Sequence, residues 1–412
     1  MKSPRIPPRF RIGLIGIGGF GETHLQQLLQ KDSGFDLTAV ADPRPASPVA
    51  EKLLAKNSVR IYSDFRSLLK NEDLDGIVIA TPIPLHFEMA TAALAKNLCV
   101  YLEKPPVVKM GLLERLIDLP GSEKVQVGFQ LPSDPRIQSL LEAIRAGRAG
   151  KLRSLRVLSL CPRNTDYYTR ASWAGKIGDS EKATFDGPMT NARSHLVHLL
   201  TSLAEAAHAG ALKDLRGEFY RARPVESYDT SSVAGTFRSG ARFSITLSHA
   251  CKGPPVSRLM IETDTGEWTF DPDTRNLTGT PGGILETWAA ATACDDYSLA
   301  PAYFDFQDLL SGRTSRARVS LRDCRMFVRL LSVGSEYPES IYTIESPGAS
   351  IEQTEDGEVY VIDKIHTAAE ICFARCCTLH ETGVSWAKPP CIIEFHPPAK
   401  AAADKWIAAP SR

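Results

Sequence analysis

The chain has 412 residues, and its 48 Lys and Arg residues balance its 48 Asp and Glu residues, so its formal charge is zero. At ~150 residues per domain, this length predicts two or three domains. A zero net charge excludes a global field that attracts nucleic acid or an anionic membrane, and no stretch approaches the ~18 apolar residues of a membrane-spanning helix. We therefore expect an enzyme-sized globular protein with neither nucleic-acid nor membrane partners.

The N-terminus and the cysteines bear on the compartment. Residues 1–10 lack the apolar run and small-residue cleavage site of a secretory signal. The nine cysteines are odd in number and scattered, which favours free thiols in a reducing compartment over a disulfide framework. Cys372, Cys376, Cys377 and His380 lie on an apolar helix-like stretch without a second ligand pair, so we expect packed thiols there and no metal. A cytoplasmic location is expected.

From Phe10 onwards, short apolar runs alternate with amphipathic stretches, the pattern of βαβ units on a parallel sheet. We predict an α/β fold whose first domain, residues 1–131, is a doubly wound Rossmann domain. The predicted strands are Ile12–Ile15, Leu37–Val40, Val59–Tyr62, Ile77–Ile79, Val100–Tyr101 and Val125–Val127. Helices predicted between them include Thr23–Gln30, Phe87–Lys96 and Met110–Leu116.

The pattern changes after residue 131, where strand-like runs become linked by short Gly- or Asp-containing turns. Residues 132–412 therefore predict an α+β domain with an open, mostly antiparallel sheet, used for substrate binding and oligomerisation. The predicted strands are Leu152–Leu160, Gly217–Ala222, Ser231–Phe237, Arg242–Leu247, Arg258–Glu262 and Glu267–Phe270. The predicted helices are Arg136–Ala146, Tyr303–Leu310, Leu321–Leu331 and Ile365–Leu379.

A glycine motif follows the first predicted strand directly and opens a helix pattern. In this context the glycines allow a tight turn and close backbone approach to a pyrophosphate at the helix N-terminus. Asp42, 21 residues after Gly21, is placed to bind the adenosine ribose hydroxyls of NAD, whereas Arg44 is placed to pair with the 2′-phosphate of NADP. NAD is the predicted cofactor, with NADP as the alternative. The motif residues are Gly16, Gly18, Gly19, Phe20 and Gly21.

Two more segments follow strands whose carboxyl ends form the ligand-binding edge of a doubly wound sheet. Thr81, Pro82 and His86 follow the fourth predicted strand, and Glu103 and Lys104 follow the fifth. A lysine at that edge can donate a hydrogen bond to a substrate hydroxyl and lower the pKa of that hydroxyl. A surface salt bridge is the alternative interpretation.

In this order, the glycine loop, Asp42, the Thr81–His86 segment and the triplet Glu103-Lys104-Pro105 resemble the glucose-fructose oxidoreductase/inositol dehydrogenase (Gfo/Idh/MocA) family. The resemblance extends to about residue 270. It implies that Lys104 lies between nicotinamide and the substrate hydroxyl, and that Gln130 lies near the nicotinamide. The Arg-Arg-Phe that often follows in the family is replaced here by Leu131-Pro132-Ser133, so no particular member's substrate transfers.

The resemblance also implies a second signature, Gly-x-x-x-Asp-x-x-x-His, whose histidine acts as acid or base. Here the corresponding segment runs from Gly187 to His195 and carries Asn191 in place of the aspartate. On a helix, Asn191 and His195 are four residues apart and face one side. The amide still orients a sugar hydroxyl but does not stabilise an imidazolium.

An aromatic and basic segment, Asp166–Trp173, precedes this signature. Aromatic faces pack against sugar C–H surfaces, and charged donors bind hydroxyls, so we predict a substrate-binding wall there. The same composition also fits an ordinary interface between domains. The predicted substrate-binding residues are Tyr168, Arg170 and Trp173, together with Arg193.

The sequence thus predicts an NAD(P)-dependent dehydrogenase that moves hydride between a sugar, cyclitol or related polyol carbon and nicotinamide, with Lys104, His195 and Asn191 as catalytic residues. Two alternatives stay open. One is an NAD-dependent glycosidase or lyase that oxidises its substrate transiently, and the other is a non-catalytic NAD-binding sensor. The family resemblance implies a homodimer or homotetramer that associates through the exposed face of the second-domain sheet.

Overall fold

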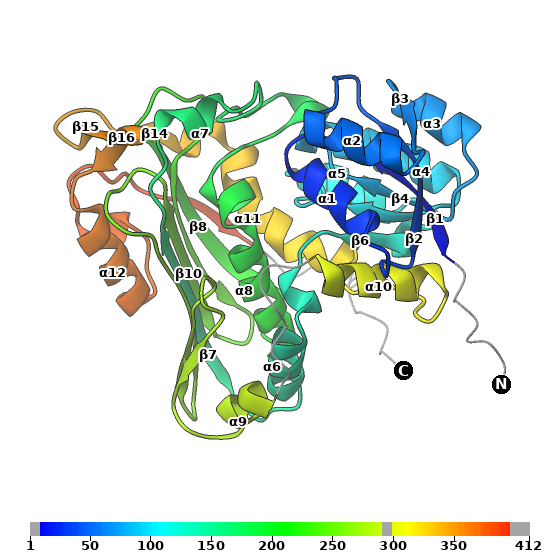
Figure 1. Cartoon of the computed structure of the whole chain (residues 1–412). Helices are drawn as coiled ribbons and strands as arrows, with labels where there is room; N and C mark the ends of the chain where they lie inside the picture. Colours follow the sequence, from blue (N-terminus) through cyan, green and yellow to red (C-terminus); the bar gives the residue numbers. More distant parts are fainter. Residues whose placement is uncertain (1–8, 291–298, 396–412) are drawn as a thin grey trace.

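The computed structural model describes residues 9–290 and 299–395, which form two large sheets and one small hairpin (Figure 1). The first sheet has six parallel strands in the order β3-β2-β1-β4-β5-β6. The strands are β1 (Phe10–Ile15), β2 (Phe35–Ala41), β3 (Arg60–Tyr62), β4 (Gly76–Ile79), β5 (Cys99–Leu102) and β6 (Val125–Val127). The predicted doubly wound Rossmann sheet is confirmed.

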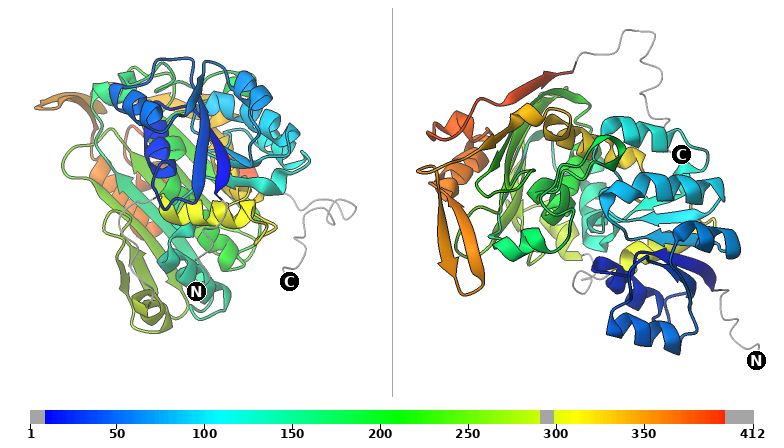
Figure 2. Two further views of the ribbon diagram at one scale, coloured as in Figure 1. Left: turned by 45° about the vertical axis from the view of Figure 1, so that its right-hand side comes forward. Right: turned by 90° about the horizontal axis from the view of Figure 1, so that it is seen from above.

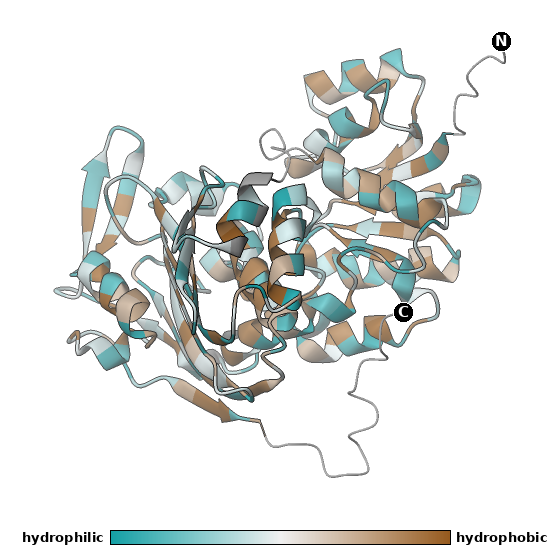
Figure 3. Ribbon diagram, turned by 90° about the horizontal axis from the view of Figure 1, so that it is seen from below, coloured by the Kyte–Doolittle hydropathy of each residue, from teal (hydrophilic) through white to brown (hydrophobic). Residues whose placement is uncertain are grey.

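Helices connect these strands and explain why the strand sequences are apolar throughout. All four residues of β4 are buried, as expected for a central strand covered on both faces, and the strands of this sheet are mostly coloured hydrophobic in Figure 3. Helix α1 begins at Phe20, three residues earlier than predicted, because the glycine loop leads directly into it. The helices are α1 (Phe20–Leu28), α2 (Pro48–Lys56), α3 (Phe65–Asn71), α4 (His86–Ala95) and α5 (Met110–Ile117).

The strand order reverses between β1 and β4, and this reversal determines where the predicted binding motifs meet. The loops after β1, β2, β4 and β5 all leave the carboxyl edge of the sheet, so the glycine loop, Asp42, Thr81 and Glu103 share that edge. Ligands of doubly wound sheets bind at such a switch point. The fold alone therefore gathers these four elements.

The chain later returns to the first sheet through helix α10 (Ala300–Leu310). Tyr303 of this helix stacks on Tyr101 of β5 with a ring separation of 5.0 Å, and Phe306 is completely buried. Figure 1 shows α10, in yellow, lying along the first sheet. The domain boundary at residue 131 stays a prediction, and the structure adds that a segment from beyond that boundary packs on the first sheet.

The second sheet has nine strands, in the order β13-β12-β11-β7-β10-β9-β8-β14, with β17 also paired to β8. Only the β10–β7 and β14–β8 pairs are parallel, so the predicted mostly antiparallel sheet is confirmed. The strands are β7 (Leu152–Leu160), β8 (Leu212–Arg221), β9 (Thr230–Phe237), β10 (Arg242–Ser248), β11 (Val256–Thr263), β12 (Glu267–Phe270), β13 (Leu277–Gly279), β14 (Ile341–Thr343) and β17 (Cys391–Glu394). The hairpin consists of β15 (Ala349–Thr354) and β16 (Gly357–Ile362).

Helices cover both faces of the second sheet. Helices α8 and α11 pack on the face toward the first domain, and α12 packs on the opposite face at β7 and β10, as the views in Figures 1 and 2 show. The face that the resemblance assigned to association is therefore covered in part by this chain's own helix. The helices are α6 (Pro135–Arg145), α7 (Thr165–Thr169), α8 (Ser194–Ala206), α9 (Gly283–Ala290), α11 (Arg325–Ser335) and α12 (Ile365–Arg375).

Two further predicted helix bounds differ from the structure. The helix predicted to reach Leu379 ends at Arg375, because Cys376 adopts a left-handed conformation with φ 55°. The helix predicted from Leu321 starts only at Arg325, after a 3-10 turn, Arg322–Cys324.

Within the described ranges, eight cysteines are free, and Cys294 lies outside them. In the same ranges, no group of three or more His, Cys, Asp or Glu side chains is arranged to hold a metal ion. None of the described helices is both long and apolar enough to cross a membrane.

Candidate active site

The glycine loop between β1 and α1 is shaped to receive a phosphate group. A Cβ on Gly21 would lie 2.2 Å from the carbonyl oxygen of Gly16, so only glycine fits where the helix crosses the turn. Gly19 has φ 56°, and no heavy atom lies within 4 Å of its Cβ position. No side chain caps α1, whose first residue, Phe20, is 49% exposed. The open cradle and the uncapped helix N-terminus fit a dinucleotide pyrophosphate.

Asp42 follows β2 and reaches back to the glycine loop. Its Oδ2 accepts a hydrogen bond from the Ile17 N–H at 3.1 Å, and its Oδ1 accepts one from the Arg44 N–H at 3.0 Å. Burial raises the pKa of Asp42, but the hydrogen bonds and charge of Arg44 and the Ile17 N–H outweigh burial and lower it. The Arg44 guanidinium lies over Gly18, with Nη2 2.8 Å from the position that a Cβ there would take. A negative carboxylate thus stands beside the loop, partly engaged by Arg44.

His86 ties together two of the predicted cofactor-binding loops. Its side chain is buried, with ring nitrogens 2.8 Å from the carbonyl oxygen of Thr81 and 2.9 Å from that of Pro105. Burial lowers the pKa of His86, and a neutral imidazole donates to only one of the two carbonyls. The Thr81 hydroxyl donates to Met89 Sδ at 3.4 Å, and Pro82 precedes the 3-10 turn Ile83–Leu85. His86 therefore fixes the loops to each other, with both ring nitrogens directed at protein carbonyls.

Glu103 lies at the centre of a buried hydrogen-bond chain. His24 Nε2 donates to Glu103 Oε1 at 3.1 Å, and Glu103 Oε2 accepts from the Lys104 N–H at 3.1 Å. Because a carboxylate only accepts, the proton between the two groups lies on His24 Nε2, and His24 Nδ1 lies 2.8 Å from the Tyr303 hydroxyl. Burial raises the pKa of Glu103, but the hydrogen bond and charge of His24 and the charge of Lys104 bring it below its usual value. Helix α10 thereby helps to orient the Glu103–Lys104 segment.

Lys104 extends from the first domain to the second. Its Nζ donates to Asn191 Oδ1 at 3.2 Å and to the Asn191 carbonyl oxygen at 3.3 Å. Asn191 Nδ2 in turn donates to Asp186 Oδ1 at 3.2 Å, so the amide oxygen must face Lys104. Burial lowers the pKa of Lys104, and the charges of Glu103 and Asp186 oppose this effect. The predicted catalytic residues Lys104 and Asn191 are therefore in direct contact.

The predicted single helix carrying Asn191 and His195 is wrong. Asn191 lies in a π-helical turn, Pro188–Ala192, and α8 starts only at Ser194, after Arg193 with φ −120° and ψ 15°. The π turn is fixed from outside, because the Tyr228 hydroxyl accepts the Thr190 N–H at 3.1 Å. The regular four-residue spacing therefore does not determine how the two side chains face each other.

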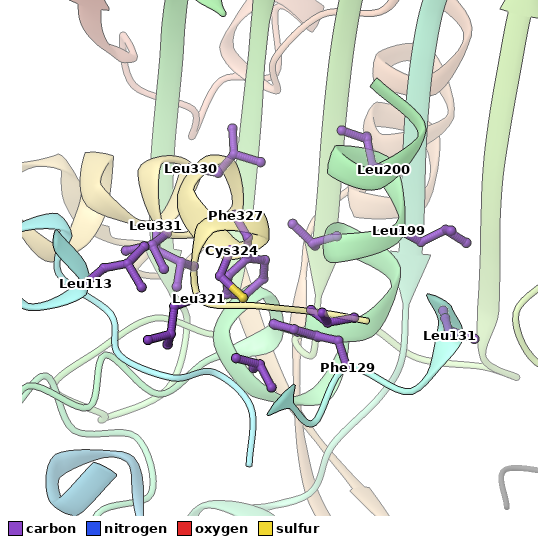
Figure 4. Close-up of a cluster of buried hydrophobic side chains, with 14 of the residues drawn as sticks. Leu113, Phe129, Leu131, Leu199, Leu200, Leu321, Cys324, Phe327, Leu330 and Leu331 are labelled. Atoms are coloured by element: carbon purple, nitrogen blue, oxygen red, sulfur yellow. The ribbon is translucent and has the colours of Figure 1, made fainter. Parts of the chain in front are cut away.

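His195 lies beside a buried aromatic cluster. Its ring packs edge-on against Phe129 at 5.8 Å, and His198 stacks on Phe129 at 4.0 Å. Figure 4 shows Phe129 among the surrounding leucines, with Phe327 nearby. Burial, followed by the charge of Lys104, lowers the pKa of His195 to about 3, and Glu103 opposes this effect. His195 is thus neutral near pH 7, and its Nδ1 is buried without a hydrogen-bond partner among the described residues.

The remaining predicted cofactor residue, Gln130, follows Phe129 and is half-buried. Its carbonyl oxygen accepts the Ser133 N–H at 3.0 Å, which begins the 3-10 turn Leu131–Ser133. Gln130 thus follows directly the residue whose ring His195 contacts.

The aromatic and basic segment lies next to the Lys104–Asn191 contact. The Arg170 guanidinium packs between the Tyr167 ring at 3.8 Å and the Trp173 ring at 4.8 Å, and it pairs with Asp186 at 3.4 Å. Tyr168 lies beneath, buried, with its hydroxyl 2.7 Å from His249 Nδ1. The predicted wall residues Arg170 and Trp173 are thus adjacent to one another, whereas Tyr167 presents its ring beside them.

Arg193 precedes α8, and its side chain is 16% exposed. Its Nη1 lies 3.5 Å from Oδ1 of Asp273, whose side chain is 46% exposed. The substrate-binding roles of Arg170 and Arg193 stay predictions.

Sequence reasoning missed two residues that organise the site, His24 and Asp186, and did not single out Tyr167 within the predicted aromatic segment. His24 shows a usable signal, since it falls on the buried face of α1 with Leu25 and Leu28, where a titratable side chain needs a partner. Asp186 shows none, because its contacts with Arg170, Gly175 and Asn191 depend on loop geometry.

The comparisons with known proteins agree with this geometry. Residues 10–130 match the family model described as "Oxidoreductase family, NAD-binding Rossmann fold". The fold and the glycine cradle define an NAD-binding Rossmann domain. Residues 10–130 thus match the NAD-binding domain of the Gfo/Idh/MocA oxidoreductase family.

Similar curated proteins match mainly this domain. The chain is 32% identical over 146 residues to the rhizopine catabolism protein MocA of Rhizobium meliloti, covering 35% of this chain and 45% of that protein. It is 34% identical over 145 residues to an inositol 2-dehydrogenase of Acidothermus cellulolyticus, covering 34% of this chain and 42% of that protein. The matches thus span less than half the length of these relatives.

Solved structures extend the likeness of the fold to the second domain. The WlbA dehydrogenase of Bordetella pertussis, solved with NADH and UDP-GlcNAcA, aligns with a TM-score of 0.67 and 22% identity, covering 81% of this chain and 96% of that one. A myo-inositol dehydrogenase of Corynebacterium glutamicum aligns with a TM-score of 0.59 and 19% identity, covering 80% and 96%. At this level of identity the likeness concerns the fold.

Proposed function

We propose that the protein is an NAD-dependent dehydrogenase that oxidises a CH–OH group of a sugar, cyclitol or related polyol. The observation that carries the proposal is the contact between Lys104 of the first domain and Asn191 of the second. This contact lies next to the carboxyl edge of the Rossmann sheet, where a nicotinamide cofactor presents its reactive carbon. The names of the similar proteins, inositol dehydrogenases and a dehydrogenase solved with a nucleotide sugar, support the same class.

When bound, NAD supplies the hydride acceptor, and the protein residues manage the proton and the orientation. Asp42 would hold the adenosine ribose, and the glycine loop would hold the pyrophosphate. Lys104 would donate a hydrogen bond to the substrate oxygen and stabilise its negative charge as the C–H bond breaks. Such stabilisation acts strongly in a site from which water is excluded.

His195 would accept the hydroxyl proton. It is neutral near pH 7 because burial lowers its pKa to about 3, and Nδ1 has no protein partner in the described structure. A neutral imidazole accepts a proton, and a low pKa ensures that the proton is passed on afterwards. Acid–base catalysis of this kind typically contributes ~10²- to 10⁴-fold to the rate.

Asn191 would orient Lys104 and a substrate hydroxyl through its amide oxygen. It does not supply a charge, so the negative charge nearest to this group is that of Asp186, one hydrogen bond away at 3.2 Å. The role proposed for Lys104 therefore depends on hydrogen-bond geometry more than on a carboxylate at residue 191.

An absorbance screen tests this proposal. The full chain is incubated with NAD, and in parallel with NADP, against a panel of polyols, cyclitols, sugars and sugar acids, and absorbance at 340 nm is followed. We expect NADH to form with at least one member of the panel. NAD binding without NADH formation on every member would contradict the proposal, and product formation without a net change in NADH would favour transient oxidation.

A further inference from the structure

The surface next to the Lys104–Asn191 contact carries more positive charge than its carboxylates neutralise. The Arg163 guanidinium lies 5.0 Å from the centre of the Tyr167 ring, and Arg170 lies 3.8 Å from the centre of the same ring. Arg170 is paired with Asp186. Arg163 makes no ion pair with any of the described residues, and its Nε is buried without a hydrogen-bond partner there. Two guanidinium groups thus lie at the Tyr167 ring, but only that of Arg170 is paired with a carboxylate.

Arg193 also carries a positive charge that its carboxylate partner neutralises poorly. Arg193 Nε is also buried without a partner in the described part of the chain, and its one carboxylate, Asp273, is exposed and 3.5 Å away. An exposed ion pair of this length contributes little. By contrast, Arg223 is matched within the core by Asp229 at 3.3 Å, so it needs no further anion.

His249 lies beside Arg163, whose N–H donates to the His249 carbonyl oxygen at 3.2 Å. Its side chain is 1% exposed, and its Nε2 has no hydrogen-bond partner among the described residues, while Nδ1 contacts the Tyr168 hydroxyl. Burial lowers the pKa of His249 far below its usual value, and Arg163 and Arg193 are among the charges that lower it further. The imidazole is therefore neutral and keeps an unused ring nitrogen, and its ring lies 5.3 Å from the same Tyr167 ring that Arg163 contacts.

Buried nitrogen donors without partners are rare and costly, because each has lost its water without gaining a hydrogen bond. The Nε atoms of Arg163 and Arg193 are two such donors, and His249 Nε2 is a further buried nitrogen without a partner among the described residues; they belong to the loop after β7, the residue before α8 and the loop after β10. This end of the second sheet also carries α7 and the β15–β16 hairpin (Figure 1). A ligand with several acceptor oxygens and a negative charge satisfies all three nitrogens at once.

We propose that Arg163, Arg193 and His249 form a subsite that binds an anionic group of the substrate, either a carboxylate or a phosphate. The inference rests on the proposed function, since it specifies the substrate of the same site. Arg163 of this subsite is linked to Lys104 through Tyr167, Arg170, Asp186 and Asn191, each in contact with the next. The substrate is accordingly an acidic or phosphorylated sugar or cyclitol whose oxidised carbon lies at Lys104.

Binding is measured first, because it does not depend on turnover. Isothermal titration with the NADH-loaded protein compares D-glucose with D-glucuronate and with D-glucose 1-phosphate at fixed ionic strength. We expect one of the two anionic probes to bind at least tenfold more tightly than glucose, and the tighter of the two identifies carboxylate or phosphate as the preferred group. Equal or tighter binding of glucose would overturn the subsite.

Variants locate the effect. Arg163→Gln removes the charge and should abolish the preference for the anionic probe, while Arg163→Lys keeps the charge and should retain part of it. Arg153→Gln, an exposed arginine near the other end of β7, is the matched control and should bind like the parent protein. If Arg163→Gln loses NADH binding and hence its fold, Arg193→Gln carries the same test. An undiminished preference in a folded variant would overturn the assignment.

NADH formation then separates the two proposals. If an anionic probe binds through Arg163 but neither this probe nor any other panel member forms NADH, the result supports the subsite and contradicts the dehydrogenase proposal. NADH formation from neutral sugars at rates that Arg163→Gln does not change overturns the subsite and leaves the dehydrogenase standing.

Discussion

Asp186 offers the sharpest test of how the site is held together. Its side chain is 1% exposed and accepts three sets of hydrogen bonds: from the Gly175 N–H at 2.9 Å, from Asn191 Nδ2 at 3.2 Å and from Arg170 Nη2 at 3.4 Å. The substitution Asp186→Asn keeps the volume but replaces one oxygen by an NH₂ group. In either orientation of the new amide, its NH₂ group faces one of these donors, so two donors oppose each other. The negative charge that faces Arg170 is also lost.

The magnitude follows from these contacts. Leaving one buried donor unsatisfied costs ~1–3 kcal/mol. Breaking a fully buried ion pair costs ~3–5 kcal/mol, but the Arg170 side chain is 27% exposed and the variant no longer buries a charge, so little of that cost applies. We expect the free energy of unfolding to fall by about 1–3 kcal/mol. Because Asn191 loses the acceptor that orients its amide oxygen toward Lys104, we also expect kcat to fall about tenfold to a hundredfold.

Urea unfolding measures the first quantity, and steady-state NADH formation measures the second. Asp118→Asn is the control, since Asp118 is exposed at the end of α5 and should change the unfolding free energy by less than about 0.5 kcal/mol. If Asp186→Asn matches this control in both stability and kcat, the proposed ordering of the site by Asp186 is wrong.

Three further predictions concern the cofactor and the base. Because Asp42 stands beside the glycine loop, NAD should bind more tightly than NADP. Fluorescence titration should show that Asp42→Ala reduces this difference in affinity, and equal affinities in the parent protein would contradict the prediction. Gly21→Ala places a Cβ 2.2 Å from the Gly16 carbonyl and should reduce NAD affinity at least tenfold, whereas Gly111→Ala, with no atom within 4 Å, should leave it unchanged. The pKa of His195 is about 3 in the folded protein and ~6.5 in the unfolded chain, so the unfolded chain binds more protons between these two pH values. The free energy of unfolding therefore rises with pH across this window, and the contribution of His195 is complete above it. For the same reason kcat/KM should show no ionisation of His195 between pH 5 and 8, and a limb near pH 6.5 that disappears in His195→Gln would refute the low pKa.

The first domain could be predicted because its signals are local. The glycine loop follows a strand and opens a helix, and Asp42 ends the next strand, so strand order alone brings them together. The Glu103-Lys104 pair was found in the same way, since parallel strands end at one edge. Buried strands and turn glycines leave unambiguous patterns in the sequence.

The second part of the site depends on contacts between distant segments. The His24–Glu103 hydrogen bond and the return of α10 to the first sheet link residues whose pairing no spacing specifies. The π turn at Asn191 was missed because it is imposed by Tyr228, a residue on another segment. The pairing of Asp186 with Arg170 and Asn191 likewise exists only in the folded chain.

The central claim is that Lys104 acts on the substrate and not on the cofactor. It is tested most directly by measuring, in one preparation of Lys104→Met, both the dissociation constant for NAD and kcat on the substrate identified by the absorbance screen. Methionine keeps most of the side-chain length but cannot donate a hydrogen bond to the substrate oxygen. The account predicts that NAD affinity stays within a few-fold of the parent protein while kcat falls by at least ~10²-fold, as for other losses of charge stabilisation in a buried site. Unchanged turnover, or a loss confined to NAD binding, would contradict it.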